Sequence, residues 1–142
     1  REEERLILDR MTGHPPSVEA SVVGLDEIKA VREAVQLVYL DDKVKNYIVD
    51  LVHASRNPDE VDLGDLVDLI EYGASSRATI FLARAARAQA FINRRAYVTP
   101  EDVKTVGPDV LRHRIVVSYE AEAEEIDSEQ IVQKLFEHVE VP

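Results

Sequence analysis

An arginine at the expected start of a long helix is the side chain of this sequence best placed to bind an anion. The turn Gly73-Ala-Ser-Ser leads into an Ala-rich stretch that predicts a helix over residues 76–95, so Arg77 falls in its first turn. Free backbone N–H groups and the helix dipole favour a phosphate there. A guanidinium is permanently charged and grips phosphate oxygens with a two-pronged fork. Arg77 is therefore the candidate phosphate contact, with Ser75 and Ser76 in support; the alternative is an exposed arginine without a ligand.

Three further arginines share the predicted face of this helix with Arg77. Arg84, Arg87 and Arg94 follow at spacings of seven, three and seven residues, which draws a cationic stripe. We interpret these three as charge that offsets the acidic loops. Nucleic-acid binding through the stripe is the alternative, and the net charge of −11 opposes it because the whole molecule repels phosphate backbones.

A second basic spot, Arg112-His113-Arg114, lies where another helix is expected to end. Cations at that position complement the free C-terminal carbonyl groups. The alternative is that Arg112 and Arg114 contact an acidic surface of a neighbouring subunit or partner.

No complete active site or metal site is expected within the chain. It lacks the phosphate-cradling motif G-x-x-x-x-G-K-[ST], the dinucleotide motif G-x-G-x-x-G, the G-x-S-x-G elbow and the H-E-x-x-H metal motif. Four histidines lie in separate elements and there is no cysteine. Any chemistry that the chain serves should be completed by residues elsewhere.

The elements that must position Arg77 are mainly helical, and we expect a helical bundle within residues 1–142. The patterning predicts an opening helix at 1–12, a linker at 13–24 around Pro15-Pro16, and a helical body at 25–142. In the body, Ile28, Val31, Val35 and Val38 draw one apolar stripe on the first helix.

Helix-breaking and helix-capping residues divide the rest of the body. Asp41 or Asp42, Thr99-Pro100 and Asp127 should start helices, and Gly107-Pro108 should kink or restart one. The acidic stretch 59–68 reads as a surface loop. The β-branched stretch 115–119 is expected to pair with residues 37–40 as a minor two-stranded ribbon.

We expect a cytoplasmic protein without a membrane partner. No apolar run approaches the roughly 20 residues that cross a bilayer, and the sequence Arg-Glu-Glu-Glu-Arg at the start is unlike a signal peptide. The absence of cysteine is compatible with a reducing compartment.

Four strings carry a family resemblance in their order and spacing. They are Gly73-Ala-Ser-Ser-Arg-Ala, Ala83-Arg-Ala-Ala-Arg-Ala, Tyr97-Val-Thr-Pro-Glu-Asp-Val-Lys and Leu111-Arg-His-Arg-Ile-Val-Val-Ser-Tyr-Glu-Ala-Glu. Together they resemble the MoxR family of AAA+ ATPases, and the likeness covers nearly the whole chain. It corresponds to the C-terminal helical lid that follows the ATPase core.

The resemblance implies that Arg77 is the sensor 2 arginine, which reaches the γ-phosphate of ATP and links nucleotide state to lid position. Ser76 departs from the proline usual in the family, although either residue suits a first helical turn. Walker A, Walker B, sensor 1, the arginine finger and the Mg²⁺ site would lie in an ATPase core of the same polypeptide, so these 142 residues alone should not hydrolyse ATP.

The resemblance also implies partners. Relatives form homo-oligomeric, usually hexameric, rings with chaperone-like roles in remodelling or maturing other proteins, often with von Willebrand factor A domain proteins. The alternative is a free-standing acidic adaptor that binds a protein partner through its loops and apolar helix faces.

Overall fold

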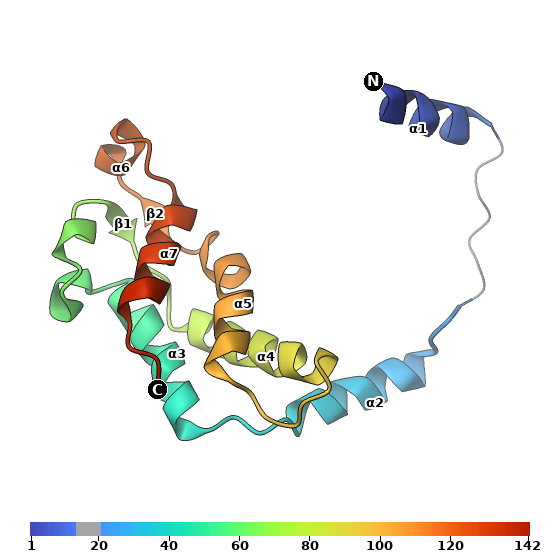
Figure 1. Cartoon of the computed structure of the whole chain (residues 1–142), viewed down its shortest axis with the longest axis horizontal. Helices are drawn as coiled ribbons and strands as arrows, with labels where there is room; N and C mark the ends of the chain where they lie inside the picture. Colours follow the sequence, from blue (N-terminus) through green and yellow to red (C-terminus); the bar gives the residue numbers. More distant parts are fainter. Residues whose placement is uncertain (14–20) are drawn as a thin grey trace. The chain divides into compact units, whose positions relative to one another are not determined.

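The structure, a computed structural model, describes residues 1–13 and 21–142 and divides into two compact units, Arg1–Val31 and Arg32–Pro142 (Figure 1). The first unit contains α1 (Glu2–Thr12), which confirms the opening helix. Three glutamates in its first turn complement the helix dipole, and none of its residues is buried. Residues 14–20 of the predicted linker lie outside the described residues.

Helix α2 (Leu25–Gln36) confirms the first predicted helix of the body, and the boundary between the units falls within it. Its apolar stripe is buried only at the end. Ile28 and Val31 are 45% and 46% exposed, Val35 is half-buried, and Val38, just beyond the helix, is buried. Helical spacing thus predicted the helix, but no residue of α2 itself is buried.

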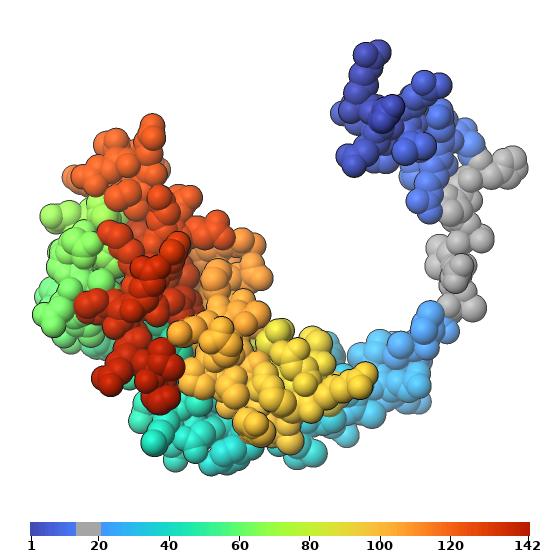
Figure 2. All heavy atoms as spheres, viewed as in Figure 1, coloured from blue at the N-terminus to red at the C-terminus, as the bar shows by residue number. Residues whose placement is uncertain are grey.

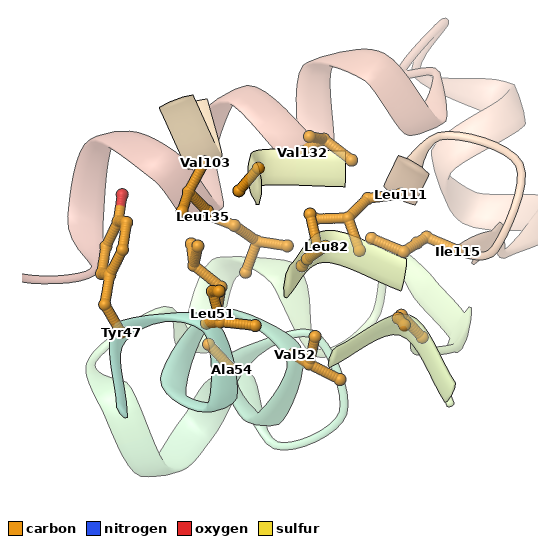
Figure 3. Packing of buried hydrophobic residues seen from close by; sticks show 14 of the residues in the cluster. Tyr47, Leu51, Val52, Ala54, Leu82, Val103, Leu111, Ile115, Val132 and Leu135 are labelled. Carbon is orange, nitrogen blue, oxygen red and sulfur yellow. The ribbon is translucent and has the colours of Figure 1, made fainter. Parts of the chain in front are cut away.

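The second unit is built around α3 (Asp42–Ala54), α4 (Arg77–Ile92), α5 (Pro100–Leu111) and α7 (Ser128–His138). Figure 3 shows Leu51, Leu82, Leu111 and Leu135, one from each of these helices, converging in one core, where all four are fully buried. Because the core draws on four helices, any one of them is held by the other three.

Small side chains form most of the buried face of α4. Its buried positions recur every four residues and are alanine except at Leu82; the other three are Ala78, Ala86 and Ala90. A stripe of small residues lets a neighbouring backbone approach the helix closely. The arginines that alternate with these alanines are thereby directed to the other faces of α4.

Capping residues start the helices where the sequence predicts. The carboxylate of Asp41 accepts from the Lys43 amide at 2.9 Å, and Thr99 and Asp127 each begin a complete capping box. Helix α5 runs through Gly107-Pro108 without restarting, although Pro108 has no N–H to donate to the carbonyl four residues before it.

The predicted ribbon exists, but its expected pairing was wrong. Strand β2 (Val116–Val117) pairs antiparallel with β1 (Ile70–Tyr72), not with residues 37–40. Tyr39 instead forms a parallel bridge with Tyr97, in which its amide donates to the Ala96 carbonyl at 2.8 Å. Segments this short carry too few side chains to specify a partner, so the packing of the flanking helices decides it.

Three short elements complete the unit. The acidic stretch predicted as a loop forms two 3₁₀ turns, η1 (Pro58–Val61) and η2 (Gly64–Leu66). After β2, Ser118 caps the short helix α6 (Tyr119–Ala123) by accepting from the Ala121 amide at 3.2 Å. Among the described residues, no helix has the length and apolarity needed to cross a membrane.

Candidate anion-binding site at the start of helix α4

Arg77 is the first residue of α4, as the turn residues before it predict. Its side chain is exposed, and no carboxylate of the described residues forms an ion pair with it. The backbone N–H groups of Ser76 and Arg77 have no acceptor among the described residues, whereas the Ala78 amide donates to the Ser75 carbonyl at 2.8 Å. The start of α4 thus carries two backbone N–H groups and one guanidinium that have no partner among the described residues.

The supporting serines differ in what they offer. Ser76 precedes the helix in αR conformation, and its hydroxyl makes no capping bond. Its carbonyl accepts from the Thr79 hydroxyl at 2.7 Å. Both Ser75 and Ser76 are exposed, so their hydroxyls are accessible to a ligand at this corner.

The turn before α4 is latched to the end of α3. The Ala74 amide donates to the hydroxyl of Ser55 at 3.0 Å, and that hydroxyl donates to the Val52 carbonyl at 2.7 Å. Arg56 donates to the Ala74 carbonyl at 3.3 Å. Because Ser55 and Ala74 are both fully buried, the latch fixes where the chain enters α4.

Gly73 is required for this latch. A Cβ added at Gly73 would lie 2.1 Å from the Ser55 carbonyl oxygen and 2.8 Å from the Arg56 Cα, both backbone atoms that cannot turn aside. The glycine in the Gly73-Ala-Ser-Ser turn thus permits a backbone contact that the sequence alone did not reveal.

The other arginines of the stripe do not pair with the acidic loops of the described residues as we expected. Arg84 is exposed and Arg87 half-buried, and neither forms an ion pair among the described residues. The Nε of Arg87 is buried without a hydrogen-bond partner. Arg94 lies beyond the end of α4 in a left-handed conformation with φ 56° and leaves the helical stripe.

Arg112 and Arg114 both have partners within the chain. Arg112 bridges Asp109 at 2.8 Å and Glu129 of α7 at 3.3 Å. The Arg114 guanidinium lies 4.6 Å from the centroid of the Phe81 ring, and its Nε donates to the Val110 carbonyl at 2.9 Å. Contact with another subunit through these residues stays a prediction.

The sequence did not reveal the ion pair between Arg95 and Asp102, which joins the end of α4 to the start of α5. Two guanidinium nitrogens of Arg95 donate to the two carboxylate oxygens of Asp102, and the Thr99 amide and hydroxyl add bonds of 2.9 and 3.0 Å. Asp102 is only 2% exposed. Burial raises its pKa, but the donors from Arg95 and Thr99 outweigh burial and hold the pKa below its ordinary value.

No metal site accompanies these groups in the described part of the chain, where no cluster of three His, Asp or Glu side chains could hold an ion. The anion corner at α4 therefore consists of a guanidinium, two serine hydroxyls and backbone amides. Such donors can bind phosphate oxygens and stabilise negative charge.

Comparison with known proteins identifies the fold and the family. Residues 67–135 match the AAA lid domain, a stretch that contains α4, α5 and the Arg77 corner. Chaperone MoxR1 of Mycobacterium tuberculosis is 35% identical over 141 residues, covering 99% of this chain and 37% of that protein. Protein MoxR of Methylorubrum extorquens is 32% identical, covering 94% of this chain and 40% of that protein.

A solved structure agrees over the whole chain. The crystal structure of a protein from Cytophaga hutchinsonii, proposed to be an ATPase, superposes with a TM-score of 0.90 and 37% sequence identity. The match covers 100% of this chain and 43% of that protein. The chain therefore spans about two-fifths of the length of these relatives. The chain belongs to the MoxR family of AAA+ ATPases and comprises its helical lid domain.

Proposed function

We propose that this lid supplies Arg77 to the terminal phosphate of an ATP bound by an ATPase core of the same polypeptide, as a sensor 2 arginine. The observation that carries the proposal is the corner itself: a guanidinium without an ion-pair partner in the described residues, at a helix start held by the Ser55 latch. An exposed arginine with no ligand gains nothing from a helix start that is fixed by buried hydrogen bonds. An arginine that must meet a phosphate in one geometry does gain from it, because the helix start positions its side chain.

The chemistry proposed for Arg77 is electrostatic. As the bond to the terminal phosphoryl group breaks, negative charge spreads over its oxygens, and a fixed guanidinium stabilises that charge. In this proposal the Mg²⁺ ligands belong to the core. The lid residues bind and orient; hydrolysis needs groups from outside them.

We further propose that ATP turnover moves the lid and that the whole protein uses this motion to remodel or mature partner proteins in a homo-oligomeric ring. The name of one relative, Chaperone MoxR1, supports a chaperone-like role. A von Willebrand factor A domain protein would be the partner to test first. The net charge of −11 argues against a nucleic-acid partner, and we place the protein in the cytoplasm.

The test uses the full-length protein that contains the core. We expect Arg77→Ala to lower kcat for ATP by about 100-fold, the usual cost of removing one donor to a developing anion. Arg77→Lys should give a kcat between those of wild type and Arg77→Ala, because an ammonium keeps the charge but lacks the two-pronged geometry of a guanidinium. Arg32→Ala is the control, because Arg32 is an exposed arginine of α2 that lies outside the α4 corner. Equal turnover by the Arg77→Ala and Arg32→Ala variants would exclude the sensor role.

A further inference from the structure

A groove between α3 and α4 combines an apolar floor with a cationic rim. It encloses about 370 Å³, and Leu40 and Ile48 form its buried floor. Val49 and Ile80, at its edge, are 50% and 51% exposed. The cations that line it are Lys45, Arg84 and Arg87.

Two of these cations lack a counter-ion. Lys45 pairs with Asp42 at 2.7 Å, but Arg84 and Arg87 form no ion pair among the described residues. The buried Nε of Arg87 also lacks an acceptor. In a chain of net charge −11, two unpaired cations beside exposed apolar side chains indicate that this groove accepts an acidic segment carrying an apolar residue.

The chain itself carries a segment with these properties. The acidic segment, Tyr119–Glu125, comprises α6 and the turn after it. Tyr119 is 84% exposed, and none of the segment's glutamates forms an ion pair among the described residues. These glutamates, all exposed, are Glu120, Glu122, Glu124 and Glu125.

The groove and the acidic segment are too far apart to meet within one copy. Both belong to the second unit, and Figure 1 places α6 at the end of that unit away from α3 and α4. The same region projects from the unit in the space-filling view (Figure 2). A second copy can therefore reach the groove with its own α6.

We propose that the acidic segment of one copy docks into the α3–α4 groove of a second copy. Tyr119 packs against Val49 and Ile80, and the glutamates pair with Arg84 and Arg87. The contact is head-to-tail, so each copy keeps one groove and one segment free for further copies. A five-residue helix covers a small area, so we expect weak, reversible association that depends on salt.

The first test is sedimentation equilibrium of the 142-residue chain at protein concentrations from ~10 μM to ~1 mM, a range suited to weak complexes. We expect the average mass to rise with concentration at low salt and to return to the monomer at high salt. Arg84→Gln/Arg87→Gln and, separately, Glu120→Gln/Glu122→Gln/Glu124→Gln should each weaken association at least 10-fold. Circular dichroism verifies that both variants remain folded.

Mixing the two variants tests the head-to-tail geometry. The groove variant keeps an intact acidic segment and the segment variant an intact groove, so an equimolar mixture should form a 1:1 heterodimer and nothing larger. Arg32→Gln/Lys43→Gln removes two exposed cations that do not line the groove and should associate like wild type. A monomeric wild type, unchanged association of either variant, or a mixture that stays monomeric would overturn the proposal. ATP turnover at Arg77 is independent of these results.

Discussion

The hydroxyl of Ser55, at the end of α3, accepts a hydrogen bond of 3.0 Å from the backbone amide of Ala74. Ala74 lies two residues before the N-cap of α4. Both residues are fully buried. This bond ties the helix that bears Arg77 to the core of the lid, so a change at Ser55 should be felt at a site that Ser55 does not touch.

Ser55→Ala should therefore lower the free energy of unfolding by about 1–3 kcal/mol, because it leaves the Ala74 amide buried without an acceptor. Urea denaturation of the 142-residue chain measures this. Ser75→Ala is the control, since Ser75 is exposed, and should change stability by less than about 0.5 kcal/mol. Similar values for the two variants would show that the latch contributes little.

Gly73→Ala should be among the most damaging single-methyl additions. The new Cβ would meet the Ser55 backbone at 2.1 Å, so the turn must shift, at a cost of about 2 kcal/mol or more. Gly64→Ala is a matched control, because nothing lies within 4 Å of its added Cβ. Thermal denaturation should show a clear drop for Gly73→Ala only; equal melting temperatures would contradict the close approach.

The ion pair between Arg95 and Asp102 should make the free energy of unfolding of the lid fall in acid. The folded-state pKa of Asp102 lies below the ordinary 3.8, so its stabilisation is complete above that value and is lost as pH falls through the folded pKa. Asp102→Asn should cost about 2 kcal/mol at neutral pH and flatten the loss of stability in acid.

Urea denaturation between pH 7 and about pH 2 tests the Asp102 prediction, because the loss begins only below the ordinary value of 3.8. Glu101→Gln, an exposed neighbour in the same helix turn, should leave the acid slope unchanged. A wild-type slope retained by Asp102→Asn would assign the acid sensitivity to other carboxylates.

Arg114 and Phe81 should be energetically coupled, since the guanidinium lies 4.6 Å from the ring centroid. A double-mutant cycle with Arg114→Ala and Phe81→Ala should give a coupling of about 0.5–1 kcal/mol. Additive losses would mean that the two side chains contribute separately, leaving Arg114 available for a partner.

Much of the helical frame could be predicted from local residues. Asp41, Thr99 and Asp127 start their helices in the structure as the sequence predicts, because a cap depends on atoms within a few residues along the chain. Arg77 likewise begins α4 as its turn sequence predicts.

Contacts between distant segments were decided only by the tertiary structure. Which helices pack together decides the pairing of β2 with β1 and the approach of Gly73 to Ser55. It also leaves Arg84 and Arg87 without a counter-ion among the residues that the structure describes. Periodicity identifies a helix face but does not name its neighbour, because many partners can bury the same apolar stripe. The sequence by itself thus determined where the main helices begin and that Arg77 begins α4. Packing decided what holds that helix start and which charges have partners among the described residues.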